Sequence, residues 1–576
     1  DCPVNLKVMP IRLNVLAVPC TVLLLQFTVH AALAQQAASH DAETTAAAPI
    51  GTGMVDDDIS DRTLQARGAR IGLIIVAVDN VFDPRNPQES GTLYRAANAL
   101  HIKTRGNTIR TQLLFHKGDV YQRHALEESA RNLRALAYLS EADIKPVAYH
   151  ADDNTVDVLV RVHDVWTFNP GISYGRSGGA NHSGVQLAES NFLGYGKALS
   201  LQTDHDVDRS DAGVSYSDPN LLSSRWQLNT TYIDASDGGT KSLSIAHPFF
   251  SLETHWSGAV DGLNEQRIDK RYQMATVVDQ YQTTHESYGG QLGWSPGLQD
   301  GWVQRWLVGY RTDRLHYNAA PVTGTLQLPA DQYLAYPWVG LSWLEDRYET
   351  TRNRDQIGRT EDIYYGRALY VQLGISATAF GSDVQSNLLQ LTLQDAWHIG
   401  STQSVFASVS ANGIHQHDGW RNTLVTTSVR YDYKFSFHTL LTAKFTSDYG
   451  IHLDPSLPLY LGDDDGLRGY PLHYISGTHR EVLNVEQRYY SNRQLLRLLT
   501  IGAVAFVDIG HIGGGSNINE TVTDGTHTLS DIGVGLRFGS IRSSTGEVFH
   551  INASYPLNAV GTARKLQLQI VTKQSF

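Results

Sequence analysis

The sequence predicts a mainly β protein in which a C-terminal transmembrane antiparallel β-barrel follows a small α+β domain. Three observations lead to this prediction. From residue 166 onward, polar and apolar residues alternate with a period of two, which is the pattern of strands with one wet and one apolar face. The N-terminal segment looks like an export signal. The rest of the chain contains neither a cysteine nor an apolar run of about 18 residues, so helical membrane spans are not expected there.

Composition narrows the function classes before any motif is considered. The 576 residues include 50 glycines and 28 tyrosines, only 18% are charged, and the formal net charge is -12. A protein that binds nucleic-acid phosphates needs clustered lysine and arginine, and the sequence has no such cluster. A nucleic-acid partner is therefore not expected. The length alone suggests several domains, but closed all-β architectures also run long, and the composition favours them.

Residues 1–34 are interpreted as a secretory signal peptide. Residues 9–34 contain a basic residue, an apolar stretch and a small-residue ending, which are the three parts of such a signal. A membrane-anchoring helix is the weaker alternative because polar residues and Pro19 interrupt the apolar stretch. Both cysteines of the chain, Cys2 and Cys20, fall within this segment. The mature chain is therefore expected to be exported and to fold without disulfides.

A linker and an α+β domain are predicted between the signal and the barrel. Residues 35–69 are small, polar and without periodicity, which is typical of a flexible linker. Residues 70–165 are predicted to fold as one α+β domain. The domain opens with a buried strand at residues 71–82, continues through an amphipathic helix at residues 123–139, and ends with an alternating strand at residues 155–166. With a short helix and a further strand between these segments, the predicted order is strand, helix, helix, strand, strand.

Residues 166–576 are predicted to form the barrel. At residues 501–509 the odd positions are apolar, whereas Phe506 and Asp508 share the other face, and the last strands repeat this pattern. A soluble β-sandwich gives the same alternation. The export signal, the lack of cysteine and a final strand that ends in Phe576 favour a membrane barrel with a wet interior. About twenty alternating runs can be marked, and an even number of strands is expected.

No enzymatic or metal-binding motif stands out. GISYG at residues 171–175 has the spacing of a nucleophile elbow around Ser173, but no helix follows it. The histidines form no metal-ligand motif. DDDG at residues 463–466 lacks the rest of a calcium loop, so its aspartates are interpreted as a solvated acidic turn. Neither an enzymatic activity nor a cofactor or metal is therefore expected.

The candidate functional residues gather around Arg468, which two glycines flank and Tyr470 follows. Downstream, Glu486 and Asp508 lie on the interior-facing side of neighbouring predicted strands. A guanidinium presents five donors in a planar fork and can bind two carboxylates together. We therefore expect a loop near residues 461–478 to fold into the barrel and to place Arg468 between both carboxylates.

These motifs resemble those of the outer-membrane assembly and transport superfamily, which includes the insertase BamA, TamA and the two-partner secretion transporters. The family has a (Val/Ile)-Arg-Gly-(Phe/Tyr) motif on a loop that folds into the barrel, an acidic residue on the next strand, and a Phe-x-Asp-x-Gly strand motif. The matching residues are, in this order, Leu467, Arg468, Gly469 and Tyr470, then Glu486, then Phe506, Asp508 and Gly510. Leucine in the first place of the loop motif is a mild departure.

The resemblance implies a sixteen-stranded barrel in the outer membrane of a Gram-negative bacterium, with residues 70–165 as one polypeptide-transport-associated (POTRA) domain in the periplasm. It implies insertion or translocation of polypeptides through a barrel whose first and last strands form a seam. The implied partners are outer-membrane lipid, unfolded or exported polypeptides, periplasmic chaperones and accessory lipoproteins. Two alternatives stay open, namely a dedicated pore for one secreted partner and a passive porin or structural barrel.

Overall fold

The computed structural model describes residues 60–576 except for short gaps. The gaps are residues 274, 321–327, 455–457, 496, 515–526, 545–547, 559–564 and 574–576. The predicted signal peptide at residues 1–34 and the terminal Phe576 lie outside the described residues. Within the described part, no helix is both long and apolar enough to cross a membrane.

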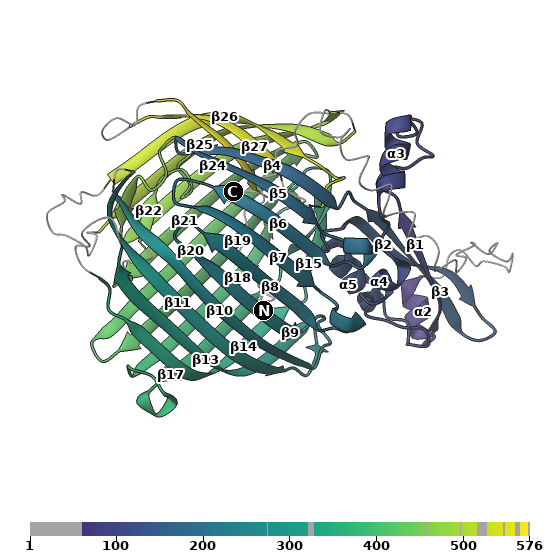
Figure 1. The fold of residues 1–576 in the computed structure, drawn as a ribbon. Helices are drawn as coiled ribbons and strands as arrows, with labels where there is room; N and C mark the ends of the chain where they lie inside the picture. Colours follow the sequence, from purple (N-terminus) through teal and green to yellow (C-terminus); the bar gives the residue numbers. More distant parts are fainter. Residues whose placement is uncertain are drawn as a thin grey trace.

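The N-terminal part folds as a small α+β domain (Figure 1). Its sheet has the order β1-β3-β2, with β1 parallel and β2 antiparallel to β3. Within residues 70–165 the predicted order of strands and helices is present, and α3 is added to it. The sequence pattern did not indicate α3 because this helix buries none of its residues. The elements are α2 (Asp61–Ala66), β1 (Arg70–Asp79), α3 (Thr92–Leu100), α4 (Gly106–Arg110), α5 (Arg123–Arg134), β2 (Leu139–His150) and β3 (Thr155–Asp164).

The ordered domain begins before the predicted boundary at residue 70. Ser60 caps α2, because its hydroxyl accepts a hydrogen bond from the Thr63 amide at 3.3 Å. Leu64 is 1% exposed and packs in the same apolar core as Ile71 and Leu133. The prediction of a flexible linker through residue 69 is therefore wrong for residues 60–69. Two apolar residues, Leu64 and Ala69, dock this otherwise polar segment, and they leave no periodic signal in the sequence.

Residues from 168 onward form one closed antiparallel barrel of twenty strands, the higher of the two strand numbers considered above. A two-residue strand, β12 (Leu298–Gln299), extends the edge of β13. The twenty strands are β4 (Phe168–Ser177), β5 (Ala180–Glu189), β6 (Ala198–His205), β7 (Ser210–Asp218), β8 (Gln227–Ala235), β9 (Gly238–His247), β10 (Trp256–Gln273), β11 (Thr276–Trp294), β13 (Trp302–Ala319), β14 (Gln332–Glu345), β17 (Ala368–Ser376), β18 (Ser386–Ile399), β19 (Gln403–Gln416), β20 (Gly419–Ser436), β21 (Thr439–Ile451), β24 (His479–Leu495), β25 (Leu499–Gly513), β26 (His527–Gly539), β27 (Val548–Pro556) and β28 (Gln567–Lys573).

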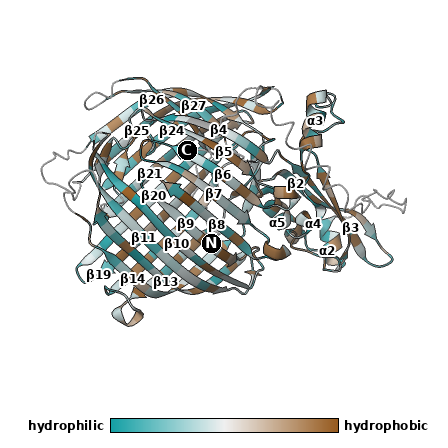
Figure 2. Ribbon diagram, viewed as in Figure 1, coloured by the Kyte–Doolittle hydropathy of each residue, from teal (hydrophilic) through white to brown (hydrophobic). Residues whose placement is uncertain are grey.

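The wall has the alternation that the sequence predicts. In β25, Phe506 and Asp508 are buried, whereas Val507 and Ile509 are 38% and 41% exposed. Hydrophobic and hydrophilic residues alternate along the strands in Figure 2. A closed barrel pairs its backbone groups between strands and leaves no sheet edge in lipid, and an apolar outer face suits a bilayer. The fold is therefore that of a membrane-spanning barrel with a polar lumen.

Two short hairpins leave the wall at opposite ends. The rim next to the α+β domain is called the domain end, and the opposite rim the far end. Strands β15 (Tyr348–Arg352) and β16 (Thr360–Tyr364) pair between β14 and β17 at the domain end. Strands β22 (Leu459–Leu461) and β23 (Ile475–Gly477) pair between β21 and β24 at the far end.

Candidate functional site

The loop between β22 and β23 packs inside the barrel. Leu467 and Tyr470 are both 0% exposed and share an apolar cluster with Val482 of β24 and Ile512 of β25. Gly466 has a φ of +103°, a backbone conformation that glycine adopts without strain. This turn directs the next residues into the lumen.

Arg468 is 4% exposed and contacts both acidic residues that the sequence singled out. Its Nε and Nη2 donate to the carboxylate of Asp508 at 2.8 and 2.7 Å, and its Nη1 donates to Oε1 of Glu486. The guanidinium carbon lies 3.5 Å from the centroid of the Phe506 ring, which adds a cation–π contact. The structure therefore brings the loop arginine, the two carboxylates and the aromatic ring into one cluster.

Glu486 is the centre of a larger charge cluster. Its Oε2 accepts a hydrogen bond from Nε of Arg488 at 2.6 Å, and Nη2 of Arg537 lies 3.7 Å from Oε1. Asn484 joins the cluster to the loop, because its amide donates to the Gly466 carbonyl and to Asp508, both at 2.7 Å. Sequence reasoning found Glu486 but did not assign a partner role to the two additional arginines.

Tyr470 fastens the loop to the last strands of the barrel. Its hydroxyl lies 2.6 Å from the Asn558 carbonyl and 3.0 Å from the Ser530 carbonyl. The Ser554 hydroxyl of β27 donates to the Arg468 carbonyl at 2.6 Å. The loop is therefore held through its backbone as well as through its arginine.

Two glycines of the motifs permit close approach. A Cβ at Gly469 would lie 2.5 Å from the Cβ of Asp531, and a Cβ at Gly510 would lie 2.7 Å from a methyl group of Leu461. Both distances are shorter than non-bonded carbon atoms tolerate. The motif glycines are thus required by packing between the loop and the barrel wall.

Replacing Gly469 with alanine is expected to weaken loop docking by about 1–3 kcal/mol, because the new methyl group overpacks the contact with Asp531. The measurement is the temperature at which the folded band converts to the unfolded band on a detergent gel. Gly290→Ala is the matched control, since a Cβ there meets its nearest neighbour at 3.8 Å. Equal conversion temperatures for the two variants would contradict the assignment.

The acidic turn before the arginine is only partly solvated: Asp464 is exposed, but the interpretation is wrong for Asp463 and Asp465. Asp463 is 3% exposed, and its carboxylate accepts hydrogen bonds from the Gly178 amide and from the side-chain amide of Gln569. Asp465 pairs with Arg480 at 2.5 Å. An acidic turn looks the same in sequence whether it faces water or a polar lumen. The signal that could have found this contact is Gln569, which lies on the polar face of the last strand.

The seam between β28 and β4 is weakly paired. Its described ladder contains one residue pair, Ile570 with Arg176, whereas the neighbouring junction of β27 and β28 contains seven. Asp463 lies across this seam, because Gly178 is in the turn after β4 and Gln569 is in β28. The in-folded loop therefore contacts β28 and the turn after β4, which lie on the two sides of the weakest described junction.

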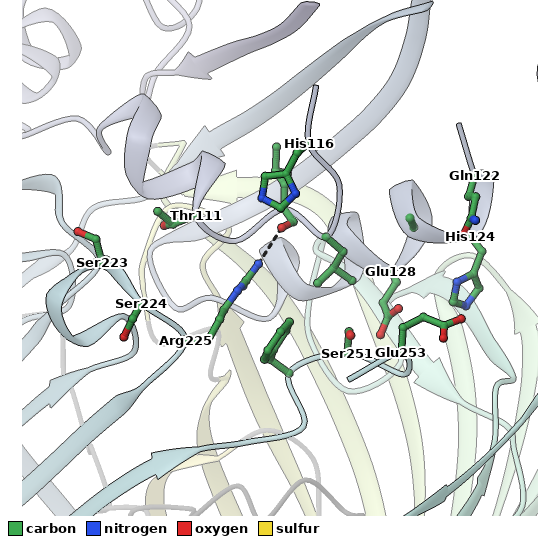
Figure 3. A pocket seen from close by; sticks show the side chains of 14 residues that line it. Thr111, His116, Gln122, His124, Glu128, Ser223, Ser224, Arg225, Ser251 and Glu253 are labelled. Atoms are coloured by element: carbon green, nitrogen blue, oxygen red, sulfur yellow. Dashed lines mark hydrogen bonds between the residues drawn. The ribbon is translucent and has the colours of Figure 1, made fainter. Parts of the chain in front are cut away.

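A cavity of about 370 Å³ separates α5 from the barrel turns at the domain end (Figure 3). On one side, Glu128 is 5% exposed and accepts a hydrogen bond from the Leu252 amide at 2.8 Å. On the other side, Arg225 reaches across and donates to the Leu113 carbonyl at 2.7 Å. The domain is thus tied to the barrel on both sides of this cavity.

Docking of the domain is expected to weaken as the pH rises. The hydrogen bond between the His124 ring and Asp346 (2.8 Å) raises the pKa of His124, although partial burial of the ring lowers it. The charge of Glu128 also raises this pKa, and the charge of Arg131 lowers it. Because docking raises the pKa of His124, the pair of His124 with Asp346 stabilises the docked domain fully at pH values below the ordinary histidine pKa of about 6.5. The contribution is lost as the pH passes through the raised pKa, and we expect it to be about 0.5–1 kcal/mol.

The test is hydrogen exchange of the Leu252 amide at pH 5.5 and pH 8, corrected for intrinsic rates. His124→Gln should remove the pH dependence. His150→Gln is the control, because His150 pairs with Asp157 within the domain. A pH dependence that survives in His124→Gln would show that another group is responsible.

The solved structures that are similar to this chain over most of its length include two kinds of outer-membrane barrel protein, BamA and CdiB. BamA from Haemophilus ducreyi lacking POTRA domains 1–3 is 11% identical and covers 87% of this chain and 84% of its own, with a TM-score of 0.37. CdiB from Acinetobacter baumannii is 12% identical, covers 88% of this chain and 73% of its own, and has a TM-score of 0.43. CdiB from Escherichia coli is 13% identical, covers 87% of this chain and 76% of its own, and has a TM-score of 0.44. No family model and no curated protein matches the chain. The similarity is one of fold.

Proposed function

We propose that this chain is an outer-membrane protein of a Gram-negative bacterium that inserts or translocates polypeptides. The observation that carries the proposal is the in-folded loop at the weakly paired seam. Arg468 holds this loop in the lumen, and Asp463 connects it to β28 and to the turn after β4. A passive porin needs neither a weak junction nor a loop that reaches across it.

The seam suits an exchange of backbone hydrogen bonds. Among the described residues, strands β28 and β4 share one ladder pair, against seven between β27 and β28, so few described backbone pairs must break to open the junction. Unpaired strand edges template the addition of another strand. Because main-chain hydrogen bonds supply the affinity, such a site accepts extended clients with little demand on sequence. In this mechanism no covalent bond is made or broken.

The α+β domain is proposed to act as the periplasmic receptor. It resembles a single POTRA domain in the order of its elements, and β2 forms one edge of its three-stranded sheet. An extended polypeptide can add to such an edge as a further strand. The domain lies beside the barrel rim and is tied to it by Arg134, whose guanidinium donates to Asp362 at 2.7 and 2.6 Å. Clients received by the domain are thus placed next to the lumen and the seam.

A dedicated secretion pore for one exported partner is the second candidate. The strand number favours it, because barrel diameter grows with the number of strands, and barrels of 16 to 18 strands already enclose an aqueous channel. Twenty strands enclose a wider lumen. The two candidate functions share the membrane, the receptor domain and the polypeptide client. They differ in the destination of the client, which is the outer membrane for an insertase and the medium for a secretion pore.

Comparing the outer-membrane and secreted proteomes of cells with and without this chain tests the proposal. Broad depletion of outer-membrane barrels is expected for an insertase, and loss of one protein from the medium is expected for a dedicated secretion pore. Unchanged proteomes with slower uptake of small solutes would overturn the proposal in favour of a passive porin. Liposome swelling with small solutes that persists after deletion of residues 70–165 would also favour a passive porin.

A further inference from the structure

We propose that the hairpin β15–β16 is a plug that closes the domain end of the lumen and that the α+β domain controls its release. Release by clients rests on the translocation function proposed above. The connection between β14 and β17 does not turn directly from one strand to the next. Its tip at residues 353–359 is buried, with Arg354 at 7% and Ile357 at 2% exposure. A polar surface turn would instead be open to solvent.

The tip binds charged side chains of the barrel wall. Nη2 of Arg354 lies 2.5 Å from the carboxylate of Asp432, and Asp355 lies 2.7 Å from the guanidinium of Arg430. Arg354 also covers the Phe406 ring, with 4.0 Å between the guanidinium carbon and the ring centroid. The hairpin thus presents one cation and one anion to complementary partners on β19 and β20.

The opposite side of the tip contacts the last part of the wall. The Arg354 carbonyl accepts hydrogen bonds from Arg488 and from the Tyr490 hydroxyl, both at 3.2 Å. Ile357 packs in one apolar cluster with Tyr490 and with Val548 of β27. Together with the contacts on β19 and β20, these interactions make the tip reach across the lumen from β19 to β27.

The hairpin is organised by itself and can move as one unit. Five ladder pairs join β15 to β16. The Glu361 carboxylate accepts hydrogen bonds from the amides of Arg354 and Asp355 at 2.9 Å and of Gln356 at 3.3 Å, which fixes the shape of the tip. A cavity of about 480 Å³ borders the tip, so the wall does not enclose it on every side. The tip therefore has space to shift without unfolding its own turn.

The α+β domain holds the same hairpin next to its tip. Arg134 of α5 forms the two-bond contact with Asp362, and Glu141 of β2 accepts hydrogen bonds from Arg352 and Thr360, both at 2.9 Å. Arg352 and Thr360 face each other in the ladder. Displacement of the domain removes these contacts next to the tip while the contacts between the tip and the barrel wall are still in place, so the domain is positioned to control the hairpin.

The plug also contacts the residues that hold the far-end loop. Arg488 donates to the Arg354 carbonyl of the plug and to Oε2 of Glu486, and Glu486 accepts from Arg468 of the loop. Hydrogen bonds therefore link the domain, the plug and the in-folded loop without interruption. Withdrawal of the plug removes one partner of Arg488 and changes the surroundings of the carboxylate that Arg468 binds.

Single-channel recording of the full chain in planar lipid bilayers tests the plug. Replacing residues 353–359 with a Gly-Ser segment of equal length is expected to raise the mean conductance several-fold, because the tip no longer occupies the lumen. Conductance equal to that of the unmodified chain would overturn the proposal.

A second variant, Ile357→Cys with Gly539→Cys, locks the plug in place. A Cβ at Gly539 would lie 2.7 Å from the Cβ of Ile357. Because disulfides prefer a Cβ separation of about 3.8 Å, the tip must retreat by about 1 Å. The oxidised form is expected to lose its channel openings, and a reductant should restore them in the same sample. Openings that do not respond to oxidation would overturn the proposal.

These results separate the plug from the proposed function. If the Gly-Ser variant has a higher conductance but the proteomes do not depend on the chain, the proposal of a plug is correct and the proposed translocation function is wrong. If the oxidised lock still passes a client at the rate of the reduced form, the plug is wrong and translocation stands.

Discussion

Arg468→Ala is expected to release the in-folded loop and to abolish most of the function. Removal of one partner from a buried ion pair costs about 3–5 kcal/mol, because the remaining charges stay buried without compensation. Here the variant leaves both Glu486 and Asp508 without the cation that they share. We expect a lower temperature for conversion of the folded band on a detergent gel, together with loss of client insertion or export.

A matched control separates this effect from the general loss of an arginine. Arg421 pairs with Asp418 in a turn where both side chains are more than half exposed. Exposed pairs contribute at most about 1 kcal/mol, so Arg421→Ala should behave like the unmodified chain. Combining Arg468→Ala with Asp508→Asn should recover part of the stability, because it removes the carboxylate that pairs with Arg468, whereas Glu486 keeps its ion pair with Arg488. Full stability and function in Arg468→Ala alone would contradict the assignment of the loop.

The central residues of the site could be predicted from the sequence because side chains alternate between the two faces of a strand with a fixed period of two. Once Val507 and Ile509 are assigned to the outer face, Phe506 and Asp508 must face the lumen. The same reasoning places Glu486 inward on the strand before. The arginine follows from chemistry, since two inward carboxylates need a cation. Parity and charge balance therefore predicted the cluster that the structure assembles.

Other features depend on tertiary contacts that no local pattern encodes. Residues 348–364 are polar and charged, and in sequence they resemble any surface hairpin. Their inward direction is set by Asp432 and Arg430, which lie on a strand far along the chain. The buried position of Asp463 depends in the same way on the turn after β4 and on β28. The strand number was also open, because alternation marks strands without showing which of them pair within the wall.

Cross-linking the two sides of the seam is expected to stop client passage if the client leaves through the wall. Arg176 and Ile570 face each other across the junction of β4 and β28. Opposed residues of antiparallel strands have Cα atoms about 4.5–5.5 Å apart, which a disulfide can bridge. The two cysteines of the chain lie within residues 1–34, so Arg176→Cys with Ile570→Cys adds a defined pair to the remainder. The measurement is client insertion or export under oxidising conditions and again after reduction.

The matched control joins two strands that are already well paired. Leu187 and Leu201 face each other between β5 and β6, in a ladder of seven pairs, so a disulfide there should leave client passage unchanged. If the seam variant fails when oxidised and recovers when reduced, while the control pair has no effect, opening between β4 and β28 is part of the mechanism. Passage through the oxidised seam variant at the reduced rate would contradict lateral opening. The client would then travel along the lumen, where the hairpin β15–β16 and the loop around Arg468 are the barriers that it must move.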